Sequence, residues 1–393
     1  MTNLPAKDRP GRVMVLVPSA FDGRGPSATC THLLDGFAAA GRDVHLFAGR
    51  FRTPAPSFRV ERAIPGIASR APYRLLSQPA RQMIERRFLA VLREGDIAYL
   101  WPNASLAVHR ELRARGVFIV QEAINSRMGY AARILDAAYD RLGVPPAHTI
   151  TQARIDEEEE KYARSDAIFC PSPMTEAALD GSGHAMAPIS TSYGTTYTPG
   201  LTAERPDPGP QGRVVFLFAG YACIRKGIDR LLAVWDRLPP NFVLRIVGDV
   251  EPAVRTLFKT ALRAPNVEIP GYSRDMPGDM AAADVFIFLS VEEGGPQVTY
   301  EAADAGLPIV TTYAGGGRFL EEQDCAVDVT GLDEEALAAV LLRIGRSREE
   351  RIERGRKARA AAPRYDWPAI SARRSADLAR ATDRSAIAAA TGA

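Results

Sequence analysis

The 393-residue chain has only four cysteines and no apolar run long enough to cross a membrane. The cysteines are far apart, and none forms a Cys-x-x-Cys pair or has a histidine at ligand spacing: Cys30, Cys170, Cys223 and Cys325. Such thiols argue against a disulfide framework or a zinc site and favour a reducing compartment. A span needs about 20 apolar residues, and the first ten residues lack the apolar core of a signal peptide. We therefore expect a cytoplasmic protein.

Lysine is also scarce, with five lysines against 44 arginines, and the net charge is only +2. The charge is uneven, because the region from Arg50 to Arg93 holds ten arginines and two acids, a formal +8. Residues 73–92 interleave apolar and basic residues at about helical spacing, as an interfacial helix does. Two interpretations stay open: a solvated helix face, or a surface that meets anionic lipid at the inner face of a membrane or a phosphate-bearing acceptor. No nucleic-acid-binding motif accompanies the charge, so we expect no nucleic-acid partner.

Strands and helices alternate along both halves of the chain. In the first half, apolar strands are expected at residues 12–17, 43–47, 96–100, 117–120 and 166–170. In the second half they are expected at residues 213–218, 242–247, 267–269, 285–289 and 308–312. This alternation predicts parallel sheets with helices on both faces, and the length suits two domains. The predicted fold class is α/β, with two Rossmann-like, doubly wound parallel-sheet domains that face a cleft.

The domain boundaries follow from composition. Residues 198–212 are polar and rich in proline and glycine, which is typical of an interdomain linker. We assign residues 1–197 to an N-terminal domain, 213–366 to a C-terminal domain, and 367–393 to a last helix. Ligands of doubly wound sheets bind at the carboxyl ends of the strands, so two such domains predict a ligand site in the cleft between them.

The most informative segment runs from Ser290 to Glu301 and reads Ser-Val-Glu-Glu-Gly-Gly-Pro-Gln-Val-Thr-Tyr-Glu. It follows a predicted buried strand and continues into a predicted helix. A strand, a Gly-rich turn and a helix start leave free backbone N–H groups, which bind anions. Glu293 flanks the turn, and Glu301 lies about two helical turns further on. Two carboxylates beside an anion site suit a ligand with both phosphates and hydroxyls, and a nucleotide-sugar is such a ligand.

A second candidate follows the strand expected at residues 213–218. There Arg225 and Lys226 precede Gly227 in a strand-to-helix turn at the predicted cleft. Two cations at this place would bind a diphosphate and stabilise the charge that develops on it as a leaving group. The alternative for this turn is a solvated Arg-Lys pair. For Glu293 and Glu301 the alternative is a helix that is capped and solvated by acids.

Taken together, these segments resemble the donor-binding domain of the retaining glycosyltransferases of family 4, which have the GT-B architecture. The matching segments occur in family order: Gly-x4-Arg-Lys-Gly at 220–227, Ile-Val-Gly-Asp at 246–249, 267–271, 283–290, the Glu-x7-Glu element and 306–316. Tyr-Asp-Trp at 365–367 is similar to the aromatic-x-Trp before the family's last helix, which usually crosses back onto the first domain. The resemblance covers about residues 213–375 well and the first half only in outline.

The resemblance implies roles for individual residues. It assigns the catalytic positions to Arg225 and Lys226, which bind the donor diphosphate, and to Glu293, which contacts the donor sugar. Glu301 would bind the ribose hydroxyls, and the base of the donor nucleotide would lie near Gly271 and Tyr272. The amides that meet the sugar and phosphates would belong to Gly294, Gly295, Pro296, Gln297 and Val298. The resemblance implies no metal and no cofactor, with the nucleotide diphosphate-sugar as co-substrate.

The acceptor side departs from the family pattern. Gly23 and Gly25 lie in a loop after the first strand, as the family's loop between the domains does. These glycines also match the pattern Gly-x-Gly-x-x-Ala of a dinucleotide site. However, they lie several residues beyond the end of the strand, and the second strand does not end in an acidic residue that could bind a ribose, which argues against such a site. Asn103 follows a strand after which many relatives carry a histidine. Glu122 and Asn125 are expected to face the cleft, either as acceptor contacts or as helix caps.

These features together predict a retaining, metal-independent glycosyltransferase. It would transfer a sugar from a nucleotide diphosphate-sugar to a hydroxyl of an unknown saccharide or lipid-linked acceptor, in the assembly of a cell-surface polysaccharide or glycolipid. Two alternatives stay open. One is a catalytically degenerate partner subunit that binds a nucleotide-sugar, and the other is a sugar-nucleotide epimerase of the same architecture. The four consecutive glutamates 157–160 point around a helix and are expected to form a solvated face instead of a metal site.

Overall fold

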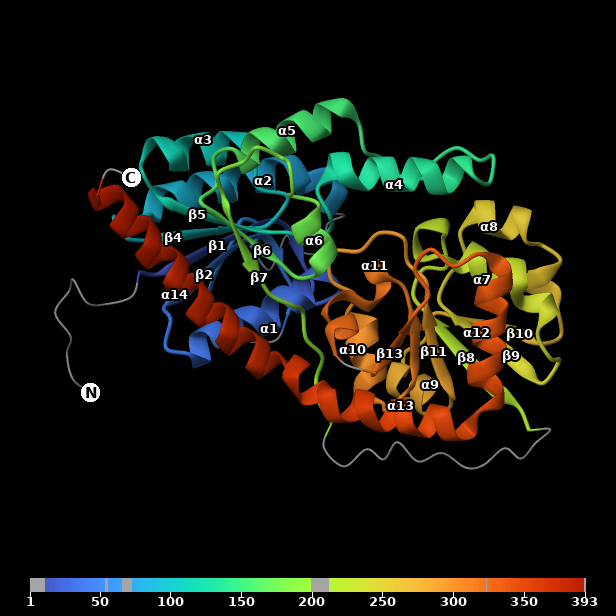
Figure 1. The fold of residues 1–393 in the computed structure, drawn as a ribbon. Coiled ribbons are helices and arrows are strands. Elements are labelled where there is room, and N and C mark those ends of the chain that lie inside the picture. The colour runs from blue at the N-terminus through green and yellow to red at the C-terminus, as the bar shows by residue number, and fades with distance from the viewer. Residues whose placement is uncertain (1–10, 54–55, 66–72, 199–211, 323, 392–393) are drawn as a thin grey trace.

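The computed structural model describes residues 11–53, 56–65, 73–198, 212–322 and 324–391, apart from the side chains of residue 74 and residues 386–391 (Figure 1). These residues form two α/β domains that lie side by side, each built on one parallel sheet. The predicted fold class is therefore confirmed. Most of the expected linker 198–212 lies outside the described residues. No helix in the described part of the chain combines the length and apolar character that crossing a bilayer needs.

The N-terminal domain has a seven-stranded parallel sheet in the order β3-β2-β1-β4-β5-β6-β7. Its strands are β1 (Val13–Phe21), β2 (Val44–Phe51), β3 (Arg59–Arg62), β4 (Ile97–Leu100), β5 (Phe118–Glu122), β6 (Ala167–Cys170) and β7 (Ala187–Ser190). Helices cover both faces (Figure 1): α1 (Pro26–Ala39), α2 (Tyr73–Val91), α3 (Leu106–Ala114), α4 (Met128–Asp140), α5 (Gln152–Tyr162) and α6 (Pro173–Ala177). Because both faces are covered, every residue of β4 and of β6 is buried, and both strands are apolar in sequence.

The C-terminal domain has a six-stranded parallel sheet in the order β10-β9-β8-β11-β12-β13. Its strands are β8 (Val214–Ala219), β9 (Phe242–Val247), β10 (Val267–Gly271), β11 (Val285–Phe288), β12 (Ile309–Thr311) and β13 (Ala326–Asp328). Its helices are α7 (Ile228–Val234), α8 (Pro252–Leu257), α9 (Met276–Ala281), α10 (Gln297–Asp304), α11 (Tyr313–Gly316), α12 (Glu334–Arg346) and α13 (Arg348–Ala361). Short 3-10 helices are η3 (Ile224–Lys226), η4 (Trp235–Arg237), η5 (Ala261–Arg263), η6 (Gly317–Glu321) and η7 (Ala362–Tyr365).

The edge strands β3, β7 and β13 were missed in the sequence. β3 reads Arg-Val-Glu-Arg, β7 reads Ala-Pro-Ile-Ser and β13 reads Ala-Val-Asp, so none has the apolar run of a central strand. Most of their residues are exposed or half-buried. An edge strand pairs on one side only, and charged residues or proline on it keep the free edge from pairing with other chains.

The last helix, α14 (Trp367–Thr391), crosses back from the C-terminal domain onto the N-terminal domain (Figure 1). It packs closely on α1, because a Cβ at Gly36 would lie 2.0 Å from the Cβ of Ser371. Ser371 Oγ donates to the carbonyl of His32 at 3.2 Å, and the His32 ring stacks on Trp367 at 4.9 Å. This helix is therefore part of both domains.

Both sheets reverse their strand order at one point. In the N-terminal sheet the reversal lies between β1 and β4, and in the C-terminal sheet it lies between β8 and β11. The loops that leave two such strands diverge to opposite faces of the sheet, which opens a crevice at their carboxyl ends where ligands of open α/β sheets bind. The turn after β8 and the loop after β11 are therefore the places where a ligand site of the C-terminal domain is expected.

Candidate active site

The turn after β8 carries Arg225 and Lys226 in the short helix η3. Gly227 ends this turn with φ = 71°, a left-handed conformation that glycine adopts without strain. A Cβ at this position would lie 2.0 Å from the carbonyl oxygen of Leu289, just beyond the end of β11. Glycine therefore lets the turn after β8 pack directly on the start of the Gly-rich loop.

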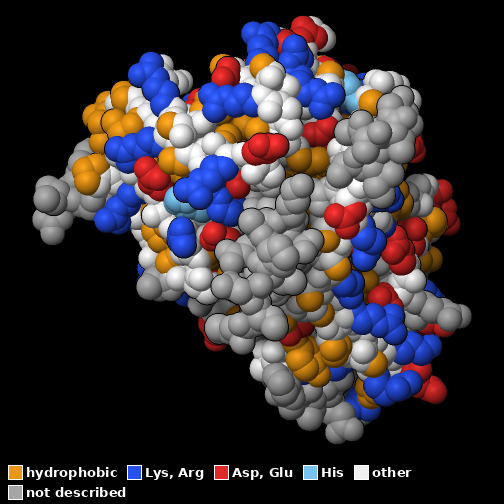
Figure 2. Space-filling model, turned by 90° about the vertical axis from the view of Figure 1, so that its left-hand side faces the viewer, with side chains coloured by type: hydrophobic (Ala, Val, Ile, Leu, Met, Phe, Trp, Pro, Cys, Tyr) orange, Lys and Arg blue, Asp and Glu red, His pale blue; other side chains and the backbone are white. Residues whose placement is uncertain are grey.

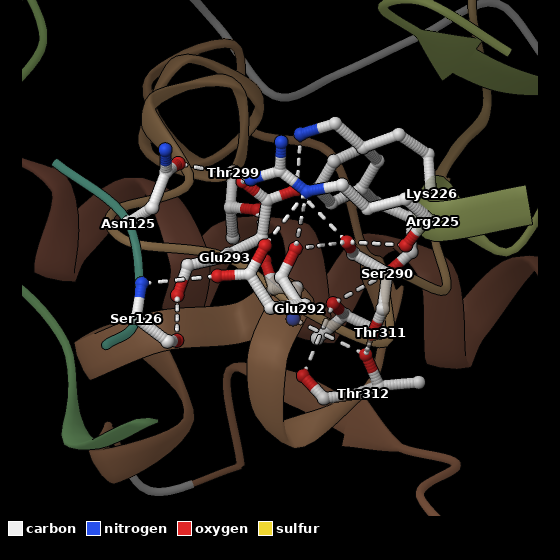
Figure 3. Close-up of polar contacts among 12 residues, drawn as sticks. Asn125, Ser126, Arg225, Lys226, Ser290, Glu292, Glu293, Thr299, Thr311 and Thr312 are labelled. Atoms are coloured by element: carbon white, nitrogen blue, oxygen red, sulfur yellow. Dashed lines mark hydrogen bonds and ion pairs between the residues drawn. The ribbon is translucent and has the colours of Figure 1, made fainter. Parts of the chain in front are cut away.

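Both cations pair with glutamates of the loop that follows β11 (Figure 3). The Nε atom of Arg225 lies 2.8 Å from Glu292 Oε2, and its Nη2 atom lies 3.9 Å from Glu293 Oε2. Lys226 Nζ pairs with Glu293 Oε1, which also accepts a hydrogen bond from Ser290 Oγ at 2.8 Å. The structure thus brings together both predicted cations and the first glutamate of the Glu-x7-Glu element.

Glu292 belongs to this cluster but was not predicted from the sequence. It is buried, and its Oε1 atom accepts a hydrogen bond from the backbone N–H of Ser126 at 3.0 Å. Arg225 reaches the same loop of the N-terminal domain, because its Nη2 atom donates to Asn125 Oδ1 at 3.1 Å. The signal that was overlooked is charge balance: two partly buried cations need two carboxylates, and the chain has Glu292 beside Glu293.

The glycines of the loop after β11 fit against the N-terminal domain. A Cβ at Gly294 would lie 2.0 Å from the carbonyl oxygen of Ile124, and one at Gly295 would lie 2.4 Å from the Tyr193 ring. The resemblance implies that the amides of these glycines meet the donor sugar and phosphates, and such a contact needs room beside the backbone. In the structure, the N-terminal domain takes that room, because the two domains are in direct contact here.

The helix after this loop contains the second glutamate of the Glu-x7-Glu element. Gln297, its first residue, donates from Nε2 to Thr29 Oγ1 on α1, which adds another contact between the domains. Glu301 is half-buried and makes no side-chain hydrogen bond or ion pair to the residues that the structure describes. Burial raises the pKa of the Glu301 carboxyl above its usual value. Glu301 is therefore a carboxylate that is partly shielded from water and still free to accept hydrogen bonds from a ligand.

Gly271 and Tyr272, which are expected to contact the base of the nucleotide, lie further along the same edge of the sheet. Gly271 ends β10 with φ = 84°, and the side chain of Tyr272 is 79% exposed. β9 separates β10 from β8, and a Cβ at Gly248, just after β9, would lie 2.1 Å from the carbonyl oxygen of Gly220. The carboxyl ends of β8, β9 and β10 therefore form one continuous rim, with Tyr272 beyond the cations.

The N-terminal domain contains a cavity of about 320 Å³ at the carboxyl ends of β4 and β5. Asn103 and Asn125 line it, together with charged side chains that include Arg81, Glu157 and Lys161. Asn125 thus joins the cavity to the cation cluster. Gly23 and Gly25 have positive φ angles of 74° and 51° in the loop between β1 and α1, and they are not among the lining residues.

The structure differs from the expectation at Glu122. Its carboxylate is buried and accepts hydrogen bonds from Tyr99, from Tyr193 at 2.8 Å and from Arg374 on α14 at 2.9 Å. The Glu122–Arg374 pair is fully shielded from solvent. The side chain of Glu122 therefore holds the last helix on the N-terminal domain, and its carboxylate is not free to bind an acceptor.

Two of the four consecutive glutamates of α5, Glu158 and Glu159, differ from the expected solvated face, whereas Glu157 is exposed. The carboxylate of Glu158 accepts from the N–H of Met128 at the start of α4, and burial raises its pKa to about 7. Glu159 pairs with Arg127 at 2.9 Å and with His184. Among the described residues, no group of three His, Cys, Asp or Glu side chains is placed to hold a metal ion. Glu158 and Glu159 therefore anchor the start of α4.

Two facing doubly wound domains, joined by a helix that returns from the second to the first, define the GT-B class of fold. Residues 213–346 match the family described as "Glycosyl transferases group 1". This match covers the β8 turn, the loop after β11 and α10, which together carry the cations and the glutamates. A search of curated protein sequences gives no match.

Several solved structures have the same fold over almost the whole chain. Sucrose-phosphate synthase from Thermosynechococcus elongatus is 21% identical, with a TM-score of 0.72 over 95% of this chain and 100% of that chain. WaaG, a glycosyltransferase involved in lipopolysaccharide biosynthesis, is 16% identical, with a TM-score of 0.64 over 92% and 98%. Anabaena HepE, in complex with UDP and glucose, is 17% identical, with a TM-score of 0.64 over 94% and 100%.

Proposed function

We propose that the protein is a retaining glycosyltransferase that transfers a sugar from a nucleotide diphosphate-sugar to an acceptor hydroxyl. The observation that carries this proposal is the convergence of Arg225 and Lys226 with the Gly-rich loop and Glu293 at the switch point of the C-terminal sheet. The family match over residues 213–346 supports the donor domain. The solved structures named above support the class of ligand, since HepE is in complex with UDP and with a sugar.

The two cations would hold the donor diphosphate. In the ligand-free structure, Glu292 and Glu293 balance the charges of Arg225 and Lys226. An incoming diphosphate offers several anionic oxygens, and charge-assisted hydrogen bonds from Arg and Lys to phosphate are strong. The cations then stabilise the negative charge that grows on the diphosphate as the bond to the sugar breaks. No metal is needed for this role in our proposal.

Retention would follow from attack on the same face of the sugar that the diphosphate leaves. The bond from the anomeric carbon to the diphosphate oxygen breaks, and the acceptor oxygen forms its new bond on that face. The acceptor proton passes to the leaving diphosphate. The protein contributes orientation and charge stabilisation, with Glu293 placed at the donor sugar and Glu301 at the ribose hydroxyls.

The acceptor would bind in the cavity of the N-terminal domain. Asn103 and Asn125 line this cavity, and Asn125 also contacts Arg225, so an acceptor hydroxyl there would lie beside the donor site. We propose a saccharide of a cell-surface polysaccharide or glycolipid as the acceptor. WaaG, which shares the fold, is described as involved in lipopolysaccharide biosynthesis, and this supports the choice.

A basic and apolar surface would place such an enzyme at the inner face of a membrane. Helix α2 turns Ala80, Ile84 and Phe88 into the core. Its outer face exposes Leu75 (69%) and Met83 (44%), and the exposed Arg86 and Arg87 follow one turn later. Figure 2, which views the molecule from the left-hand side of Figure 1, shows Lys and Arg side chains mixed with hydrophobic and acidic side chains. Part of the Arg50–Arg93 region lies outside the described residues: residues 54–55 and 66–72, and the side chain of residue 74.

A nucleotide screen tests the proposed function. Purified protein is titrated with UDP, GDP and ADP in a calorimeter, and their sugar derivatives are then tested for release of free nucleotide with and without acceptor extracts. We expect one nucleoside diphosphate to bind and the nucleotide release to depend on acceptor. Binding without acceptor-dependent release would instead indicate a binding partner without turnover, and conversion of the sugar without any acceptor would indicate an epimerase.

A further inference from the structure

Helix α4 connects the two domains at both of its ends. In Figure 1 it runs from the N-terminal domain out over the C-terminal domain toward α7 and α8. The residues just before the helix, Asn125 and Ser126, contact Arg225 and the loop after β11. The residues at its C-terminal end contact the other side of the turn that carries the two cations. α4 therefore touches both segments from which the proposed donor site is built.

The C-terminal contact passes through one buried carboxylate. Tyr139 Oη donates to Glu251 Oε1 at 2.7 Å, and both residues are buried. The other oxygen of this carboxylate, Oε2, accepts from the backbone N–H of Ile224 at 2.9 Å. Ile224 is the first residue of η3, so the carboxylate joins a hydroxyl of the N-terminal domain to the start of the cation turn. The N–H of Glu251 donates to the carbonyl of Ala222 at 3.0 Å, which fixes the glutamate against the same segment.

A second contact lies directly after the turn. Arg141, which follows α4, pairs with Asp229 in the first turn of α7. Asp229 is buried, and burial raises the pKa of its carboxyl. Its Oδ1 atom has no hydrogen-bond partner among the described residues. A buried carboxylate without a cation is costly, so Arg141 supplies a charge that the start of α7 needs. The end of α4 thus holds the cation turn on both sides, at Ile224 and at Asp229.

We propose that Tyr139 is a positioning residue for donor binding, which acts through Glu251 on the turn that carries Arg225 and Lys226. The inference rests on the proposed function, because it concerns the same diphosphate site. Tyr139 lies outside that site and fixes the backbone from which the cations extend. When the domains are in contact, the hydroxyl of Tyr139 satisfies the buried Glu251 and the turn is held in place. When they separate, Glu251 loses this partner, so donor affinity depends on domain contact.

The experiment compares Tyr139→Phe with Tyr130→Phe in the full-length protein. Both changes remove one hydroxyl from α4, and the Tyr130 hydroxyl has no hydrogen-bond partner among the residues that the structure describes. The first readout is amide hydrogen exchange at residues 222–229 in the ligand-free protein, where the amides of Ile224, Lys226 and Gly227 are hydrogen-bonded. The second is the affinity for the nucleoside diphosphate that binds the wild type. The third is the melting temperature, which separates positioning from a purely stabilising role.

We expect faster exchange at residues 222–229 and about tenfold weaker nucleotide binding in Tyr139→Phe, since the change leaves the buried Glu251 carboxylate without one of its donors. Tyr130→Phe should match the wild type in exchange and affinity. In a double-mutant cycle, the effects of Tyr139→Phe and Glu251→Gln on affinity should not add, because the two side chains contact each other directly.

Three results would count against the proposal, and they differ from one another. Unchanged exchange and unchanged affinity in Tyr139→Phe, with normal nucleotide binding by the wild type, would overturn the positioning role alone. A lower melting temperature with unchanged affinity would assign Tyr139 to stability and overturn it as well. If the wild type binds no nucleoside diphosphate at all, the proposed function fails, and the role of Tyr139 in donor binding fails with it.

Discussion

The two domains have the same topology but differ in what they place at the switch point. In the C-terminal sheet, the loops that leave β8 and β11 carry two cations, two buried glutamates and a Gly-rich turn. In the N-terminal sheet, the loops that leave β1 and β4 carry Gly23, Gly25 and Asn103, with no comparable cluster of charges among the described residues. The fold provides a crevice in both domains, and the side chains at the switch point decide which crevice can hold a diphosphate.

The largest expected effect concerns the joint between the domains. Arg374→Met should lower the free energy of unfolding by about 3–5 kcal/mol, because it leaves the buried Glu122 carboxylate without its cation. Chemical denaturation of the wild type and of Arg374→Met measures this difference in unfolding free energy. Arg373→Met, at an exposed position of the same helix, is the control. A loss below about 1 kcal/mol would show that the buried pair does not hold α14 on the N-terminal domain.

The next effect concerns the charged groups at the switch point of the C-terminal sheet. Lys226→Ala should lower turnover by about 10²–10³, the scale seen when one charge-stabilising donor is lost. Lys259→Ala, at an exposed position of the same domain, should leave turnover unchanged. Release of free nucleotide from the donor measures both. A loss of less than a few-fold in Lys226→Ala would remove Lys226 from the mechanism.

Glu301 should affect stability and binding in opposite directions. Burial raises its pKa in the folded protein, so the folded state favours the protonated form, and stability falls as the pH rises from the ordinary value of 4.5 through the raised one. Glu301→Gln removes this penalty and should raise the melting temperature at pH 7. It should also weaken nucleotide binding about tenfold, because a neutral acceptor replaces a charged one at the ribose hydroxyls.

The matched measurement is the pH dependence of the melting temperature. The stability gain of Glu301→Gln over the wild type should vanish below pH 4.5, where the wild-type carboxyl is protonated in both the folded and the unfolded states. Unchanged nucleotide affinity in this variant would place the ribose elsewhere. The proposed donor site would then lose its contact with the ribose.

The smallest effect concerns the N-terminal domain. If the exposed face of α2 meets anionic lipid, Arg86→Gln should weaken binding to phosphatidylserine vesicles about fivefold, since each basic residue near the surface contributes about 1 kcal/mol. Arg263→Gln, at an exposed position of the C-terminal domain, is the control. Equal vesicle binding by the wild type and both variants would leave α2 as a solvated helix face.

The sequence predicted more of the donor side than of the acceptor side for a physical reason. Arg225, Lys226 and Glu293 meet because short turns leave neighbouring strands, and the positions of such turns can be inferred from the strand–turn–helix pattern. Glu122 was assigned to the cleft because it follows a strand, but its partner Arg374 lies 252 residues away on α14. Contacts between segments so far apart are set by the docking of a whole helix, which local sequence does not reveal.

The Gly-rich loop shows the same limit. The sequence indicates that Gly294 and Gly295 allow a close approach, and the structure identifies Ile124 and Tyr193 of the other domain as the groups that approach. Glu292 was missed although its cation Arg225 lies at the same edge of the sheet, and its other contact, the amide of Ser126, comes from the other domain. Sequence reasoning therefore reaches most contacts within one sheet edge and misses those made where the two domains meet.

The most direct test is a crystal structure of the protein with the nucleoside diphosphate that it binds. The account predicts that the diphosphate lies within hydrogen-bonding distance of Arg225 and Lys226, and that the ribose hydroxyls donate to Glu301. A nucleotide that binds without contacting either cation would contradict it.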